Sequence, residues 1–163
     1  MKTKLLPAFL LVSFLLTLFV SCSRDGRRHD QTVGVRPEDP EMVAAIAKAR
    51  SLLPEFWRIY DHPEHGETDF CLKVKLAHKD QVEHFWVSDL ERANGTVFGK
   101  INNDPEFVKT VKLGQRIQII EADISDWLYM RDRKMHGNYT ARALFKQMSP
   151  KEVETYKKML ADP

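Results

Sequence analysis

Hydrophobic and polar residues follow two periods along the chain, and the first of them is helical. Apolar side chains recur every three or four residues, as expected for the buried face of a helix. They are Met42, Ile46, Ala49 and Leu53. The preceding Asp39-Pro40-Glu41 supplies an N-cap and a proline at the first helical position, so we predict that a helix begins here. Pro54 interrupts the pattern, and residues 55–60 can add a second helical turn or two.

From residue 70 the period changes to two, which is typical of a strand with one buried face. Apolar residues alternate with Cys71, Lys73 and Lys75, so we expect Cys71 to be partly exposed on the lysine face. Residues 83–90 form a second predicted strand. Asn94-Gly95 then favours a tight hairpin into a third strand, over residues 96–101.

The rest of the chain mixes short helices with strands. Asp104-Pro105-Glu106 repeats the signal of a cap followed by proline and predicts a short helix that ends near Gly114. Residues 116–122 and 124–130 are predicted as strands with a kink between them, and the C-terminal part is predicted to be helical. We therefore expect an α+β fold, with an antiparallel sheet of about five strands and helices packed on one face.

Asp126 stands between apolar neighbours in the last predicted strand. If Ile124 faces the core, strict alternation turns Asp126 inward and Trp127 outward; if Trp127 faces the core, Asp126 points outward. Either arrangement is unusual for one of these side chains. A buried carboxylate needs donors, so we expect Asp126 to accept hydrogen bonds from Arg142 or from the turn of residues 137–140, which includes Tyr139 and Thr140.

The N-terminal part resembles a secretory leader. Two lysines precede an uncharged, mostly apolar run over residues 5–20, which is shorter than a comfortable membrane span. Phe19-Val20-Ser21-Cys22 resembles the lipobox of bacterial lipoproteins, although leucine is more typical than Phe19. We predict a signal peptide over residues 1–21 and a lipidated Cys22. An uncleaved anchor or an ordinary secretory signal is the alternative.

These features predict the domain organisation and the cellular location of the chain. Residues 22–37 are expected to form the lipidated cysteine and a flexible tether, and residues 38–163 a single α+β domain. Lipidation leaves Cys71 without a disulfide partner, whereas a Cys22–Cys71 bridge would require the leader to be retained. We expect the protein in the bacterial cell envelope, and Ser23 favours the outer membrane facing the periplasm where the source has one.

Charge changes with processing. The chain has 25 Lys and Arg and 23 Asp and Glu, and residues 1–21 contain two lysines and no acids, so 23 of each remain. The mature chain is therefore close to neutral. This balance does not favour a nucleic-acid partner, which would require a basic face.

Few residues are arranged as catalytic or metal-binding groups. His62 and His65 share a loop with Glu67 and Asp69, but no third ligand is set by spacing, so we favour a solvated loop and expect no metal or cofactor. Neither a nucleophile elbow nor a phosphate loop occurs, and Ser125 has no base at a recognisable spacing, so no catalytic residue is assigned.

Four motifs carry a resemblance to a known family. They are Glu83-His84-Phe85-Trp86-Val87; Gly99 with Asn103-Asp104-Pro105; Ile124-Ser125-Asp126-Trp127 with Tyr129; and Gly137 with Thr140 and Arg142. In this order they resemble the domain of unknown function 2314 family, the YegJ-like bacterial proteins, over residues 40–148, with Phe85 where methionine is more frequent. The resemblance implies a single-domain bacterial protein, sometimes with a secretory leader, and brings no established activity.

Two hypotheses follow. The first is a non-enzymatic envelope lipoprotein that binds a protein, peptide or small molecule. Its candidate binding or structural cluster is His84, Trp86, Asn103, Asp104, Asp126, Trp127, Tyr139, Thr140 and Arg142. The second is a small hydrolase or other enzyme that uses His84, Asp126 and His136. The distances among these three groups, and whether they line a pocket, distinguish the hypotheses.

Overall fold

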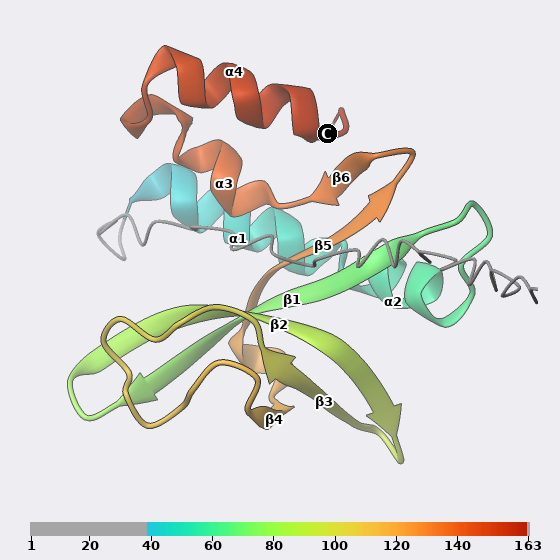
Figure 1. Ribbon diagram of the computed structural model, residues 1–163, viewed down its shortest axis with the longest axis vertical. Helices are drawn as coiled ribbons and strands as arrows, with labels where there is room; N and C mark the ends of the chain where they lie inside the picture. The colour runs from blue at the N-terminus through green and yellow to red at the C-terminus, as the bar shows by residue number, and fades with distance from the viewer. Residues whose placement is uncertain (1–38, 163) are drawn as a thin grey trace, which may run out of the picture.

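The computed structural model describes residues 39–162, which form one antiparallel sheet and four α-helices (Figure 1). The helices are α1 (Pro40–Ser51), α2 (Leu53–Asp61), α3 (Tyr139–Ala143) and α4 (Pro150–Met159), with short 3-10 turns at Glu121–Asp123 and Phe145–Gln147. The strands are β1 (Thr68–His78), β2 (Gln81–Ala93), β3 (Thr96–Ile101), β4 (Arg116–Ile119), β5 (Ile124–Arg131) and β6 (Lys134–Gly137). No helix among these residues has the length and apolar character needed to cross a bilayer.

The strands lie in the order β4-β3-β2-β1-β5-β6, and every neighbouring pair is antiparallel. The α+β prediction is confirmed, with six strands instead of about five. The additional strand, β6, follows a turn at Asp132 and Arg133, both of which have positive φ (51° and 60°). This turn was missed because it contains neither the glycine nor the asparagine that usually marks a two-residue hairpin.

Local sequence signals predict the structure that forms at two other points. The Asp39 carboxylate accepts hydrogen bonds from the backbone N–H groups of Glu41 and Met42, which caps α1. The hairpin between β2 and β3 turns at Asn94 and Gly95, whose φ angles of 52° and 75° fit the left-handed conformation that these residue types tolerate.

The predicted helix over residues 104–114 is not formed. Glu83, with 3% of its surface exposed, accepts hydrogen bonds from the backbone N–H groups of Glu106, Phe107 and Val108 at 2.8–2.9 Å. This carboxylate on β2 satisfies donors that a helix N-terminus would leave free, and it folds the segment back onto the sheet. Val108 is thereby buried in the core. A contact distant in sequence overrides the local helix signal.

The main core lies between one face of the sheet and the helices α1, α2 and α3. Figure 1 shows α1 and α3 side by side next to β5, with α4 beyond α3 near β6. The main core residues include Phe56 from α2, Leu72 from β1 and Phe85 from β2. A smaller cluster on the other face contains Cys71, Trp86, Leu128, Met135 and Leu160.

The prediction of a partly exposed Cys71 is therefore wrong. Its side chain is buried, with 6% of the residue exposed, because β1 lies in the middle of the sheet between β2 and β5. Leu128 and Leu160 pack in the same cluster. Lys73 and Lys75 follow Cys71 at alternate positions, but they do not make Cys71 exposed, because the neighbouring elements cover it with apolar side chains.

Strand β5 also departs from both predicted alternatives. Residues 124–129 are all buried, and Ile124, Trp127 and Tyr129 all belong to the main core. Strict alternation is broken by a bulge, because Lys73 pairs with Asp126 whereas its neighbour Val74 pairs with Ile124. Ser125 is the extra residue. The bulge lets Ile124 and Trp127 share a face although they are three residues apart.

Candidate binding cleft

Asp126 joins β5 to the start of α3. Its carboxylate has no exposed surface and accepts hydrogen bonds from the Thr140 N–H and hydroxyl, both at 2.7 Å, and from the Trp127 N–H at 2.8 Å. The predicted contact with the turn is confirmed. The predicted partner Arg142 is wrong, because its Nη2 donates instead to the Ala161 carbonyl at 2.8 Å. Burial raises the pKa of Asp126, and the hydrogen bonds from Thr140 and Trp127 oppose that rise.

Trp127 is fixed at the same junction. Its indole Nε1 donates to the Ala49 carbonyl at 2.8 Å, and its own carbonyl accepts from the Asn138 N–H at 2.8 Å. Gly137 packs against it so closely that an added Cβ would lie 2.3 Å from the Trp127 carbonyl oxygen and 2.5 Å from the ring. This position therefore requires glycine. The junction aligns Trp127 with the aromatic residues beside it.

A row of aromatic rings covers the helix-facing side of β5 and β6. Trp127 and Tyr129 are nearly parallel, at 2° and 6.0 Å between centroids, and Tyr129 stacks on His136 at 4° and 4.9 Å. Tyr139 meets Trp127 with its edge, at 78° and 5.6 Å. The register explains the row, because Trp127 and Tyr129 share a face of β5 and Tyr129 pairs directly with His136 on β6.

These rings form part of a cleft of about 170 Å³ that includes residues from α1's C-terminal end, α2, β5, β6, α3 and the C-terminal segment. Its lining residues are Leu52, Glu55, Ile59, Trp127, Tyr129, Arg131, His136, Gly137, Tyr139, Arg142 and Asp162. A larger hollow of about 300 Å³ lies between the turns that flank β1 and β5, but it has no aromatic side chain in its lining. The smaller cleft combines apolar, aromatic and charged groups, which is the usual composition of a ligand site.

The ionisable rings of the cleft are uncharged near neutral pH. Burial, and then the charge of Arg131, lower the pKa of His136, while Asp132 and Glu67 partly offset this effect. Burial likewise raises the pKa of Tyr129 and Tyr139 above the usual value for a phenol. The formal charges in the cleft therefore belong to its arginines and carboxylates.

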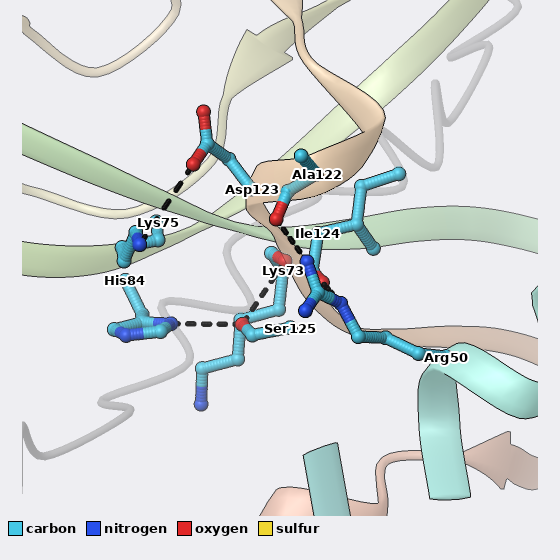
Figure 2. A network of polar contacts seen from close by, with 8 residues as sticks. All are labelled: Arg50, Lys73, Lys75, His84, Ala122, Asp123, Ile124 and Ser125. Atoms are coloured by element: carbon cyan, nitrogen blue, oxygen red, sulfur yellow. Dashed lines mark hydrogen bonds and ion pairs between the residues drawn. The ribbon is translucent and has the colours of Figure 1, made fainter. Parts of the chain in front are cut away.

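A second polar group lies at the bulge of β5 (Figure 2). His84 Nδ1 is 2.8 Å from the Ser125 hydroxyl, which donates to the Lys73 carbonyl at 3.1 Å. Because that hydroxyl has one proton, this arrangement assigns the proton between Ser125 and His84 to the imidazole Nδ1. Burial, followed by Lys73 and Lys75, lowers the pKa of His84 to about 4. The imidazole is therefore neutral at pH 7.

Arg50 holds the same bulge from the helical side. Its Nε donates to the Ile124 carbonyl at 2.9 Å, and its Nη2 donates to the Ala122 carbonyl. Figure 2 shows this guanidinium and His84 on opposite sides of Ser125. The bulge is thus held between α1 and β2, which explains how the extra residue is kept in the middle of a sheet. Neither contact has a signal in the linear sequence.

Comparison with known proteins identifies the family. A family model described as an uncharacterized protein conserved in bacteria (DUF2314) matches residues 39–161. The chain belongs to this family. It is 34% identical to the uncharacterized protein YegJ of Escherichia coli strain K12 over 113 residues, which cover 69% of this chain and 72% of YegJ.

A second relative is a putative ankyrin repeat protein of Neisseria meningitidis serogroup B. It is 30% identical over 126 residues, which cover 72% of this chain and 50% of that protein. No solved structure matches the chain. The comparisons therefore place the chain in the DUF2314 family.

The structure divides the predicted cluster of this DUF2314 chain into separate groups. Asp126 and Thr140 form the junction, while Trp127, Tyr139 and Arg142 line the cleft. His84 and Trp86 lie on β2, where the Trp86 N–H donates to the Asn103 side chain at 2.8 Å. Asp104 is exposed in the following loop. The cleft residues that sequence reasoning left out include Glu55 and Asp162, which lie far from the motifs in sequence and enter only through packing.

The three residues of the enzyme hypothesis are not brought together. His136 stacks on Tyr129 at the main core, whereas His84 alternates with the core residue Phe85 and therefore points to the other face of the sheet. Asp126 is occupied by Thr140 and by the Trp127 amide. Within the described residues these groups do not converge on one substrate position.

The histidine loop before β1 is organised by a carboxylate. The His65 N–H donates to the Glu67 side chain at 2.8 Å, and Arg131 approaches the same side chain at 3.5 Å. Across residues 39–162, no three His, Cys, Asp or Glu side chains are grouped so that they could hold a metal ion. Glu67 therefore has a structural role in this loop.

Proposed function

We propose that this protein is a lipid-anchored component of the bacterial cell envelope whose folded domain binds a small ligand in the cleft. The observation that carries the binding role is the convergence of aromatic rings and charged groups from several elements on one concavity. A preformed site with a buried aromatic floor and a few polar groups is the usual arrangement for recognising a small molecule. Binding needs no reacting groups at the site, unlike catalysis.

The sequence of the leader supports the anchor. A basic start, an apolar run and a small residue before Cys22 are the features on which lipoprotein processing depends. The acyl chains on Cys22 would keep the domain at a membrane surface, because more than one chain is needed for stable attachment. Residues 23–37 would let the domain move while it stays attached. We place the domain on the periplasmic side of the outer membrane where the source has one.

A small envelope hydrolase is the second candidate. The contact between His84 and the Ser125 hydroxyl favours it, because an imidazole beside a hydroxyl can activate a nucleophile. However, Ser125 is only 4% exposed, and its hydroxyl donates to a carbonyl rather than to the imidazole. Labelling with a fluorophosphonate probe tests this candidate: labelling that is lost in Ser125→Ala would favour the hydrolase over the binding protein.

The binding role is tested by ligand capture. The full-length chain in detergent is incubated with the low-molecular-mass fraction of an envelope extract, and bound compounds are identified by mass spectrometry. Glu55→Trp places a bulky side chain at the exposed rim of the cleft and should abolish capture. Glu64→Trp makes the same change at an exposed loop position outside the cleft and should not. Equal capture by the two variants would contradict the assignment to this cleft.

A further inference from the structure

The charged groups that line the cleft include both signs, and three of them have no ion partner among the described residues. Glu55 and Asp162 are carboxylates and Arg142 is a cation, and all three contribute to one lining. Among the ion pairs of residues 39–162, none includes any of these three side chains. The remaining charge of the cleft, Arg131, already pairs with Glu67 at 3.5 Å. The cleft therefore presents opposite charges that do not neutralise each other directly.

Arg142 is held in place with donors to spare. Its Nη2 donates to the Ala161 carbonyl, which orients the guanidinium without cancelling its charge. A guanidinium has five N–H donors, so most of them are not used by this contact. Its Nε is the one buried side-chain nitrogen or oxygen of the described residues that has no hydrogen-bond partner. A fixed cation with unused donors is suited to a carboxylate.

The pKa values of two cleft tyrosines are affected by charges of both signs. The pKa of Tyr139 is raised mainly by burial; among the charges, Asp126 raises it most, Arg142 lowers it and Glu55 raises it further. Glu55 also raises the pKa of Tyr129, which Arg131 lowers. Glu55 and the arginines therefore lie within electrostatic range of the same phenols. A ligand seated over these rings would be close to both signs of charge.

We propose that the cleft binds a zwitterionic molecule of amino-acid size, with its carboxylate at Arg142 and its ammonium group at Glu55. This inference rests on the binding role proposed above and names its ligand class. The volume of about 170 Å³ is smaller than the several hundred Å³ of sites for larger ligands, so it suits a single amino acid. Leu52, Ile59 and the aromatic row supply an apolar wall for the ligand's side chain.

Three matched probes test the charge pattern. L-leucine has both charges, L-leucinamide has only the ammonium and N-acetyl-L-leucine has only the carboxylate. Affinities are measured by isothermal titration calorimetry at neutral pH with the full-length chain in detergent. L-leucine is expected to bind about tenfold or more tightly than either singly charged probe, because each charged hydrogen bond contributes about 1.4 kcal/mol or more.

Substitution of Glu55 tests whether this residue binds the ammonium group of the ligand. Glu55→Gln should weaken L-leucine about tenfold and leave N-acetyl-L-leucine unchanged, whereas the exposed control Glu64→Gln should affect neither. N-acetyl-L-leucine binding as tightly as L-leucine would overturn the zwitterion and leave the cleft as a carboxylate site. If none of the probes binds, the ligand class is wrong, while the capture experiment with Glu55→Trp still decides the binding role.

Discussion

At the scale of single residues, buried polar groups hold this domain in one arrangement. Asp126 and Glu83 are carboxylates whose exposed fractions are 0% and 3%, and each accepts three hydrogen bonds from nearby donors. A buried carboxylate without such donors would be strongly unfavourable. Both residues therefore connect segments distant in sequence, and this structural role is distinct from that of the cleft.

Replacing Asp126 should destabilise the domain before it alters binding. Asp126→Ala leaves the Thr140 and Trp127 donors unpaired in the interior, and we expect a loss of about 3–5 kcal/mol in the free energy of unfolding. Asp126→Asn keeps one acceptor oxygen and should cost less. Urea unfolding measures both, with the exposed Asp104→Ala as control. A fully stable Asp126→Ala protein that no longer binds ligand would instead make Asp126 a site residue.

His84 should make stability depend on pH. Its pKa in the folded protein is about 4, below the ordinary value of about 6.5, so the unfolded chain binds the proton more readily. The stabilising contribution is full above about pH 6.5 and is lost as pH falls towards about 4. Burial raises the pKa of Asp126, so this group has the opposite effect on stability: its contribution decreases as the pH rises through its titration.

The comparison of wild type with His84→Asn isolates the histidine, because the amide can still donate to Ser125 and does not titrate. Urea midpoints are measured at several pH values between about 4.5 and 7.5. The wild type should lose stability faster than His84→Asn as the pH falls. Parallel pH profiles for the two proteins would rule out a depressed pKa at His84.

At the scale of elements, the junction between β6 and α3 depends on one glycine. Gly137 has a φ of +77° and no room for a Cβ, whereas Gly95 has a similar φ of +75° but nothing within 4 Å. Gly95→Ala should cost about 1–2 kcal/mol from backbone strain alone. Gly137→Ala adds a collision with Trp127 and should cost at least about 2 kcal/mol more. Thermal or urea unfolding of the pair checks this, and equal losses would mean that the Trp127 contact relaxes freely.

Elements with strong local signals were predicted from the sequence, and those that depend on distant contacts were not. Helix α1 and the Asn94-Gly95 hairpin are encoded by caps and turn residues that act over a few positions. The segment after Asn103 contains an equally good helix signal, but its backbone N–H groups donate hydrogen bonds to the Glu83 carboxylate instead of forming a helix. Local propensity is weak compared with three hydrogen bonds to a buried carboxylate.

The candidate site likewise contains residues that the sequence groups correctly and residues whose position depends on distant contacts. Trp127, Tyr139 and Arg142 were predicted to belong to one cluster and do line one cleft, because they lie near one another in the chain as well as in the fold. His84 was grouped with them and lies on the other face of the sheet, paired with Ser125. Sequence spacing alone does not place His84 and Trp127 on opposite faces of the sheet, because the bulge in β5 shifts the alternation of that strand.

At the scale of the whole molecule, the anchor is the feature to test first. We expect intact mass to show an N-terminus at a diacylated or triacylated Cys22, and metabolic labelling with an alkyne fatty acid to report the same residue. Cys22→Ser should abolish labelling and release the protein from the membrane fraction, with Cys71→Ser as the matched control. An unmodified chain that begins at Met1 would overturn both the processing and the lipid anchor.

The sequence by itself determined the α+β class, the first helices, the central hairpin and membership of the DUF2314 family, because each is written in short-range patterns or in motif order. The tertiary structure alone decided the burial of Cys71, the loop at residues 102–115 and the separation of His84 from His136. It also placed Glu55, Asp162 and Arg142 in the lining of one cleft. These features depend on strand register and on contacts between distant residues, which local propensity and periodicity do not contain.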